Sequence, residues 1–369
     1  MLLLGNEAIA RGALEAGLSF ATCYPGTPSS EIPEQFLHIS QETDLYFEYS
    51  TNEKVALEVG AGAAACGLRT MVTMKHVGLN VAADPLMTLA YVGVKGGMVI
   101  VNADDPSLFS SQNEQDNRYY ARLSGLPMLE PTTVQEMKDA TVAAFDLSEE
   151  LGLPVILRTT TRLNHIRGGV ELGKLPPRKT KGTFKKDPFN LVTVPAVSRK
   201  LHQVLLEKYD RALEKSEQWP YNQLTGKGKW GIVANGVSVN YVRDAIVDLG
   251  IADKVTLLKL GFSWPLPKAL MTRFLKQVDK VLVVEELEPI MENELKALAQ
   301  ENGITIPIKG KGVGGLSRLF EYDPGLVRKS VAEYFGIDYK APAMVEMSDL
   351  PPLPRSEEHT SELQSRQSI

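Results

Sequence analysis

Apolar and polar residues follow one another along the first 160 residues in the rhythm of a layered α/β domain. Short apolar runs that suit buried parallel strands occur at 20–24, 46–49, 70–74, 98–101, 128–129 and 154–157. Between them, apolar residues recur at helical spacing near 6–17, 52–66, 80–91 and 132–149. The pattern predicts a doubly wound α/β domain, in which ligands bind beyond the carboxyl ends of the strands.

The pattern changes near residue 170 and returns near residue 228. Residues 168–190 combine three prolines with six lysines or arginines, which favours a solvated connection between domains over an anion-binding site. A helix is expected over about 196–215. Four further strands, at 230–234, 256–260, 280–284 and 304–308, alternate with helices near 238–249, 266–277, 290–301 and 326–335. They predict a second, smaller and separate α/β domain.

Composition and charge narrow the class of protein. The 369 residues are 43% hydrophobic and 23% charged, which is ordinary for a globular chain. Cys23 and Cys66 are too few for a four-ligand zinc or iron–sulfur site, and we expect reduced thiols in an intracellular protein. The net charge of −5 offers no basic field, so no nucleic-acid partner is expected. Apolar runs fall short of the ~20 residues that span a bilayer, so we expect no membrane association and a cytoplasmic location.

The C-terminal tail has a different character from the rest of the chain. Residues 355–369 lack apolar periodicity, and their first eleven residues resemble the in-frame translation of a sequencing adapter. The alternative is an exposed polar terminus. We therefore expect residues 355–369 to be foreign and the native protein to be truncated near Pro354.

Candidate site residues follow the predicted strands of the first domain. The hydroxyl-rich run Thr27 to Ser30 begins a helix, where an anion is favoured, although a capped turn is the simpler interpretation. Ser50 and Glu53 have capping-box spacing, which would fold the glutamate back onto the Ser50 backbone. Lys75 and His76 lie in a loop after a strand, a better position for a site than for a core histidine.

A nearly unbroken polar run extends from Asp104 to Arg118. Its composition suits neither a packed core nor a simple charged helix, and the alternative to a functional segment is an exposed loop. Asp104 and Asp105 suggest a metal site, but no third ligand stands at a useful spacing.

The second domain offers two weaker candidates. Glu285 and Glu286 end a predicted strand and are expected to be solvated. Gly310, Gly312 and Gly315 match the spacing of a dinucleotide fingerprint, but no ribose-binding acid follows a second strand.

Together these segments resemble one family. The motifs are Tyr24-Pro25-Gly26-Thr27-Pro28-Ser29-Ser30, Asn52-Glu53, Lys75-His76-Val77-Gly78-Leu79-Asn80 and 111–118, with 260–267 and 284–289 in the second domain. They resemble the alpha subunits of indolepyruvate ferredoxin oxidoreductases, which are thiamine diphosphate-dependent 2-oxoacid:ferredoxin oxidoreductases. The resemblance implies a pyrimidine-binding domain at 1–170, a linker and helical connection at 171–227, and a transketolase C-terminal-like domain at 228–340. Residues 341–354 would then begin a linker to a missing diphosphate-binding domain.

The resemblance also implies roles for particular residues. Glu53 would hydrogen-bond N1′ of the thiamine aminopyrimidine, because a carboxyl group that shares its proton there favours the imino tautomer, whose 4′-nitrogen deprotonates thiazolium C2. The other implied site residues are Gly78 for the cofactor, Thr27 for the substrate carboxylate, and Lys75, His76 and Arg122 as weaker candidates for the same anionic pocket.

The implied activity is oxidative decarboxylation of aryl-2-oxoacids such as indolepyruvate, with coenzyme A accepting the acyl group and ferredoxin the electrons. A separate beta subunit is implied as well. Magnesium and 4Fe-4S clusters are expected only in the missing region, because the chain has no Gly-Asp-Gly motif and two cysteines. We therefore expect this polypeptide alone to be inactive. The alternatives are a non-catalytic α/β binding or scaffolding subunit, in which Glu53 is only a cap, and a nucleotide-binding oxidoreductase that uses Gly310 to Gly315.

Overall fold

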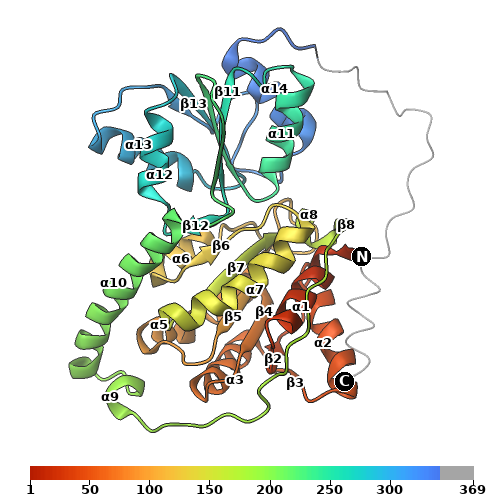
Figure 1. Cartoon of the computed structure of the whole chain (residues 1–369), viewed down its shortest axis with the longest axis vertical. Helices are drawn as coiled ribbons and strands as arrows, with labels where there is room; N and C mark the ends of the chain where they lie inside the picture. Colours follow the sequence, from red (N-terminus) through yellow and green to blue (C-terminus); the bar gives the residue numbers. More distant parts are fainter. Residues whose placement is uncertain (341–369) are drawn as a thin grey trace. The chain divides into compact units, whose positions relative to one another are not determined.

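The computed structural model describes residues 1–340, so the segments predicted at 341–354 and 355–369 lie outside the described residues. Residues 1–339 form one compact unit built on two large sheets and one small one (Figure 1). The strands are β1 (Leu2–Leu4), β2 (Phe20–Cys23), β3 (Tyr46–Tyr49), β4 (Thr70–Lys75), β5 (Met98–Asp104), β6 (Met128–Leu129), β7 (Val155–Thr160), β8 (Arg167–Gly169), β9 (Gln223–Gly226), β10 (Trp230–Asn235), β11 (Val255–Leu260), β12 (Phe262–Trp264), β13 (Lys280–Val284) and β14 (Ile308–Lys309).

The helices connect these strands. They are α1 (Gly5–Glu15), α2 (Glu31–Glu42), α3 (Glu53–Ala65), α4 (His76–Val81), α5 (Ala83–Val92), α6 (Arg118–Ser124), α7 (Val134–Leu151), α8 (Thr161–His165), α9 (Pro188–Leu191), α10 (Pro195–Glu217), α11 (Ser238–Asp248), α12 (Lys268–Leu275), α13 (Ile290–Glu301) and α14 (Pro324–Phe335). None of the helices within 1–340 is long and apolar enough to cross a membrane.

The first large sheet has the strand order β12-β6-β7-β5-β4-β2-β3. Its strands are parallel except β12, and α1, α2 and α7 pack together as one helical layer while α3 and α5 pack together as another. Every residue of β5 is buried, as expected for a parallel strand covered on both faces. Because β2 lies between β3 and β4, the chain changes winding direction there, and the loops after β2 and β4 meet at the switch point.

The second large sheet has five strands, in the order β14-β13-β10-β11-β9, where the sequence predicted four. The additional strand β9 is antiparallel to β11 and lies at the edge of the sheet. It was not predicted because its half-polar sequence carries no apolar alternation. The strand expected at 304–308 pairs only from Ile308. Pro307 directly precedes the pairing and has no N–H to donate, although its carbonyl accepts from Val281 N at 2.8 Å.

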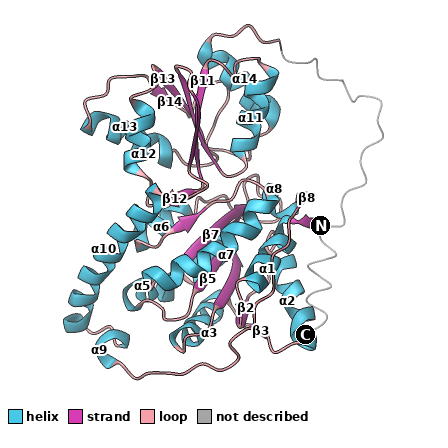
Figure 2. Ribbon diagram, in the orientation of Figure 1, coloured by secondary structure: helices cyan, strands magenta, loops and turns pink. Residues whose placement is uncertain are grey.

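The two large sheets are not built from two consecutive parts of the chain. β12 follows β11 of the second sheet, yet it pairs antiparallel with β6 at the edge of the first sheet (Figure 2). Phe262 of β12 is fully buried and meets Trp219 edge to face, with ring centroids 5.7 Å apart. Residues from the second half of the chain therefore complete the first sheet.

The connection between β8 and α10 is exposed, as predicted, but it is fastened to the first domain. Thr183 N donates to Cys66 O at 2.8 Å, and Lys179 Nζ donates to Gly67 O at 2.9 Å. Further along, Asn190 Nδ2 donates to Val92 O at 3.1 Å. The predicted solvated linker thus runs along the surface of the first domain before α10 begins.

Truncation of Phe262 tests the shared strand. Replacement by alanine removes a buried ring where β12 joins the first sheet, and we expect the free energy of unfolding to fall by about 3–5 kcal/mol. Urea unfolding followed by circular dichroism measures the change. Leu319, which is 60% exposed, supplies the control, and its replacement by alanine should change stability by less than about 0.5 kcal/mol. Equal effects of the two variants would contradict this account of β12.

Candidate functional site

The loops after β2, β4 and β5 meet at the switch point of the first sheet. Gly26 lies against Lys75 so closely that a β-carbon added at Gly26 would stand 2.9 Å from Lys75 Cδ. Lys75 Nζ donates to Ser110 O at 2.8 Å, and Ser110 Oγ donates to Thr27 O at 3.1 Å. The structure therefore brings Thr27 and Lys75, two of the predicted site residues, to the same place.

Glu53 is the first residue of α3, and it does not close a capping box. Asn52 is the N-cap, and its side chain accepts from Val55 N at 2.9 Å, while Ser50 Oγ donates to Glu48 Oε1 at 3.0 Å. The cap interpretation of Glu53 is therefore wrong. The glutamate is only 9% exposed, and burial raises its pKa, although its own backbone N–H and the charge of Lys75 oppose the rise.

Gly78 of α4 is the close neighbour of this carboxyl group. A β-carbon added at Gly78 would lie 2.6 Å from both Cγ and Oε1 of Glu53. Any side chain at position 78 would have to displace the glutamate. Because Gly78 has no side chain, it leaves the space that the Glu53 carboxyl group occupies.

His76, the first residue of α4, is completely buried. Its Nε2 lies 3.0 Å from Asn113 O and 3.1 Å from Asn113 Oδ1. Both oxygens accept hydrogen bonds only, so Nε2 carries a hydrogen and donates it to Asn113. Nδ1 is buried and has no hydrogen-bond partner among residues 1–340.

The polar run after β5 is anchored and is not a freely exposed loop. Asp105 accepts hydrogen bonds from Ser110 N at 2.9 Å, Ser111 Oγ at 2.7 Å and Thr161 Oγ1 at 2.7 Å. Burial alone would raise the pKa of Asp105, but these hydrogen bonds outweigh it and lower the pKa. The Asp105 carboxylate thus already accepts hydrogen bonds from three protein groups. Residues 1–340 contain no group of three acidic, histidine or cysteine side chains placed to hold a metal ion.

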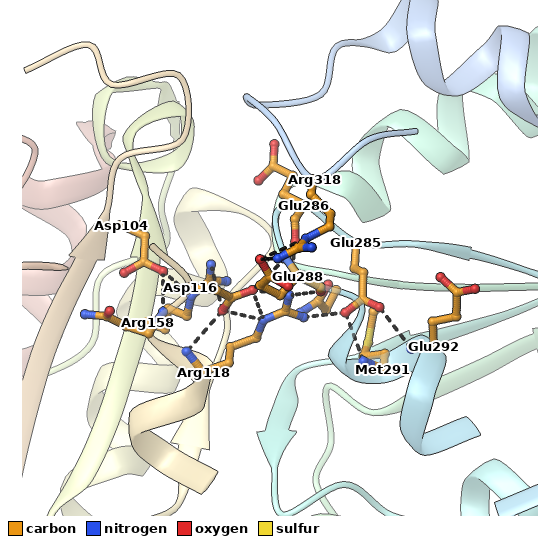
Figure 3. Close-up of polar contacts among 12 residues, drawn as sticks. Asp104, Asp116, Arg118, Arg158, Glu285, Glu286, Glu288, Met291, Glu292 and Arg318 are labelled. Atoms are coloured by element: carbon orange, nitrogen blue, oxygen red, sulfur yellow. Dashed lines mark hydrogen bonds and ion pairs between the residues drawn. The ribbon is translucent and has the colours of Figure 1, made fainter. Parts of the chain in front are cut away.

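The far end of the polar run forms a buried charge network with the second domain (Figure 3). Arg118 Nε lies 2.9 Å from Asp116 Oδ1, and Arg118 Nη1 lies 2.6 Å from Glu285 Oε2. Asp116 is held ionised, because the arginines beside it outweigh its burial and lower its pKa to about 2. The prediction of a solvated strand end at Glu285 and Glu286 is therefore wrong.

Glu286 lies in the same network. It lines a small cavity of about 10 Å³ together with Arg118, Glu130 and Arg158, which leaves room for roughly one water molecule. Arg158 Nε contacts Asp104 Oδ2 at 2.7 Å. Burial raises the pKa of Glu286 to about 7, against the opposing effects of the Tyr322 N–H and Arg158.

Arg122 does not join the group around Lys75. Its Nη1 lies 2.7 Å from Glu294 Oε1 of α13, and its guanidinium lies over the Trp264 ring, 5.3 Å from the centroid. The structure therefore places Arg122 in a contact with the second domain.

The glycine-rich segment 310–315 does not form a phosphate-binding turn. A phosphate turn requires a helix to begin directly after it, but α14 begins only at Pro324. Gly310 instead packs against Glu292, and Lys311 N donates to Glu292 Oε2 at 2.9 Å. This geometry removes the nucleotide-binding alternative.

Sequence reasoning missed Arg158 and the roles of Arg118, Glu285 and Glu286. One local signal was present: Arg158 lies inside the otherwise apolar and hydroxyl-bearing strand β7, where a charged residue requires a buried partner. Nothing local pairs Arg118 with Glu285, because 167 residues separate them.

Two family models match the chain. Residues 11–195 match the model described as pyruvate flavodoxin/ferredoxin oxidoreductase, thiamine diphosphate-binding, and residues 221–301 match the indolepyruvate ferredoxin oxidoreductase middle domain. The chain belongs to the pyruvate flavodoxin/ferredoxin oxidoreductase family. The resemblance seen in the sequence is thereby confirmed.

Curated relatives agree with this oxidoreductase family. Indolepyruvate oxidoreductase subunit IorA of Methanothermobacter thermautotrophicus is 47% identical over 357 residues, which are 96% of this chain and 57% of that protein. The Thermococcus kodakarensis protein of the same name is 47% identical over 345 residues, 92% of this chain and 53% of that one. The chain thus spans little more than half the length of these relatives.

Solved structures confirm the predicted fold class. A 2-oxoglutarate:ferredoxin oxidoreductase from Magnetococcus marinus superposes with a TM-score of 0.71 at 17% identity, over 90% of this chain and 65% of that chain. A split-gene transketolase superposes with a TM-score of 0.59 at 15% identity, over 90% of this chain and 97% of that chain. This chain therefore has the α/β architecture of both.

Glu286 should make stability depend on pH in a defined direction. Its folded-state pKa of about 7 lies above the ordinary value of 4.5, so its contribution is fully present below pH 4.5 and is lost as the pH rises through 7. We expect a loss on the order of 3 kcal/mol over this range, and Glu286→Gln should abolish it. Urea unfolding at pH 4.5 and 7.5 measures the difference. Glu288→Gln on the same loop is the control and should keep the wild-type dependence, whereas an unchanged dependence in Glu286→Gln would contradict the assignment.

Proposed function

We propose that this chain carries the aminopyrimidine half of the thiamine diphosphate site in an enzyme that oxidatively decarboxylates aryl-2-oxoacids such as indolepyruvate. The observation that carries the proposal is the buried Glu53 carboxyl group at the start of α3, with its raised pKa. It lies within the segment matched by the thiamine diphosphate-binding family model. The curated relatives that cover this segment are named indolepyruvate oxidoreductase subunits.

The residues around Glu53 fit an aminopyrimidine ring. A carboxyl group whose pKa is raised by burial is suited to share a proton with N1′, because the raised pKa brings the proton affinities of the two atoms closer together. Gly78 leaves the carboxyl group in place and adds no side chain beside it. Bound thiamine diphosphate supplies the electron sink that decarboxylation of a 2-oxoacid requires.

Thr27 and Lys75 are proposed to hold the substrate carboxylate, whereas His76 is left out because its Nε2–H donates to Asn113. Lys75 and Thr27 are joined through Ser110, and the Lys75 charge acts on Glu53. Their loops lie at the switch point, where ligands of α/β sheets bind. Arg122 is left out of this group because its guanidinium pairs with Glu294.

The rest of the reaction requires other parts of the enzyme. The solved relative from Magnetococcus marinus has coenzyme A and succinyl-CoA bound, which supports coenzyme A as the acyl acceptor here, and ferredoxin is proposed as the electron acceptor. The relatives are named as a subunit, which supports a partner beta subunit. Magnesium and 4Fe-4S clusters are assigned to other parts of the enzyme, because this sequence has no Gly-Asp-Gly motif and two cysteines. Within this chain, residues 1–170 are proposed as the pyrimidine-binding domain, 171–227 as the connection and 228–340 as the transketolase C-terminal-like domain.

Replacement of Glu53 by glutamine tests the catalytic assignment. In the complete enzyme we expect kcat for indolepyruvate to fall by about 10²–10⁴-fold, because an amide cannot share a proton with N1′. Ferredoxin reduction measures turnover. Glu58→Gln changes an exposed carboxylate on the same helix and should leave turnover unchanged. Wild-type turnover in Glu53→Gln would instead favour the non-catalytic scaffolding alternative.

Gly78→Ala tests the position of the Glu53 carboxyl group. The new methyl group would stand 2.6 Å from Oε1, so the glutamate must move, and a displacement of about 1 Å costs up to about 10²-fold in kcat. Gly62→Ala in α3 is the matched control, because a β-carbon there meets nothing within 4 Å. Steady-state kinetics of the two variants decide the matter, and equal turnover in both would show that the contact is unimportant.

A further inference from the structure

The segment from Asn113 to Arg118, which leads from the polar run after β5 into α6, makes two sets of contacts that alternate along the chain. The odd-numbered residues contact α4, and the even-numbered residues contact the second domain. We call these residues the coupling segment.

The odd-numbered face of the coupling segment holds His76 at both its ring and its backbone. The two oxygens of Asn113 accept from the ring at Nε2, as described above. Gln115 Nε2 donates to His76 O at 3.1 Å, and Asn117 Nδ2 donates to the same carbonyl at 3.0 Å. Gln115 also exchanges hydrogen bonds with the Asn80 side chain, both at 2.9 Å. Three amide side chains therefore fix the first turn of α4.

The even-numbered face is fastened to loops of the second domain. The Glu114 carboxylate accepts from Phe320 N at 3.0 Å. Asp116 Oδ2 accepts from Glu288 N at 3.1 Å, and Arg118 Nη2 donates to Glu288 O at 2.8 Å. Backbone groups of the second domain thus hold Glu114, Asp116 and Arg118 in place.

We propose that the coupling segment transmits the docking of the second domain to the candidate site, and that Glu114, Asp116 and Arg118 are positioning residues for His76. Contacts on the even-numbered side fix the backbone of the segment. The fixed backbone aims the amides that hold His76 with its Nε2–H on Asn113 and leave Nδ1 without a partner among residues 1–340. His76 stands two residues before Gly78, which abuts Glu53. The effect on catalysis rests on the proposed function, whereas the effect on the His76 ring does not.

Among the three positioning residues, Glu114 is the one whose replacement should disturb folding least. Arg118 and Asp116 are buried charges, and removal of either takes one charge partner from the other in the interior. Glu114 is only partly buried, and its carboxylate joins Ser107 N at 2.6 Å to Phe320 N. Ser107 Oγ in turn accepts from Glu321 N at 2.9 Å, which provides a second and independent link to the same loop.

The experiment records the ring ¹⁵N resonances of histidine in the chain, with the His76 signals assigned by their loss in His76→Gln. Wild-type His76 should show the Nε2–H pattern. In Glu114→Ala the pattern should shift toward a mixture of tautomers. Ser107→Ala should shift it in the same direction, and this variant serves as the test if Glu114→Ala folds poorly. Glu114→Gln, which keeps an acceptor oxygen, should restore the wild-type pattern, and Gln112→Ala, an exposed neighbour in the same loop, should leave it unchanged.

A wild-type His76 pattern in both Glu114→Ala and Ser107→Ala would overturn the proposal. In the complete enzyme, Glu114→Ala should lower kcat by between about twofold and 30-fold with a smaller change in KM. The ring signals need no cofactor, so they report on the coupling even where Glu53→Gln retains wild-type turnover and the proposed function fails. A shifted His76 pattern combined with unchanged kcat would keep the structural coupling and remove its catalytic consequence.

Discussion

The buried guanidinium of Arg118 is the charge that must be paired where the loop after β5 meets the end of β13. A charged group in the interior is tolerated only when its donors are all paired, and Arg118 meets the carboxylates of Asp116 and Glu285 and the carbonyls of Glu286 and Glu288. These partners come from the polar run after β5 and from the end of β13. The same contacts raise the pKa of Arg118 well above its ordinary range against the effect of burial, so the charge is permanent. Arg118 therefore joins the end of β13 to the loop that borders the candidate site.

The site depends on this constraint through short polar contacts. Docking on Arg118 orders the coupling segment, and the amides of that segment hold His76 at the start of α4. Two residues later Gly78 accommodates the Glu53 carboxyl group. The switch point of the first sheet brings the loops after β2, β4 and β5 together, and the parallel strands behind them are largely buried. Packing and charge thus position the Glu53 carboxyl group, and burial raises its pKa and with it its affinity for a proton.

The sequence predicted the parts of this structure that local patterns determine. Strands such as β4 and β13 and helices such as α13 lie within a residue or two of their expected ranges, because buried strands and amphipathic helices leave periodic signals. The exchange of β12 into the first sheet was not predicted, because three residues carry no information about their partner strand. Glu285 was misassigned for a related reason: a glutamate at a strand end is usually solvated, and the arginine that buries it is 167 residues away. Motifs located Glu53, but only the structure separated it from the Asn52 cap.

The central claim is that the Glu53 carboxyl group meets the aminopyrimidine ring of thiamine diphosphate. An experimental structure of the complete enzyme with the cofactor bound tests this claim most directly. The account predicts a hydrogen bond of about 2.6–3.0 Å between a carboxyl oxygen of Glu53 and pyrimidine N1′, with no side chain between them at position 78. A pyrimidine ring whose N1′ faces another residue, or a cofactor bound away from α3 and α4, would contradict it.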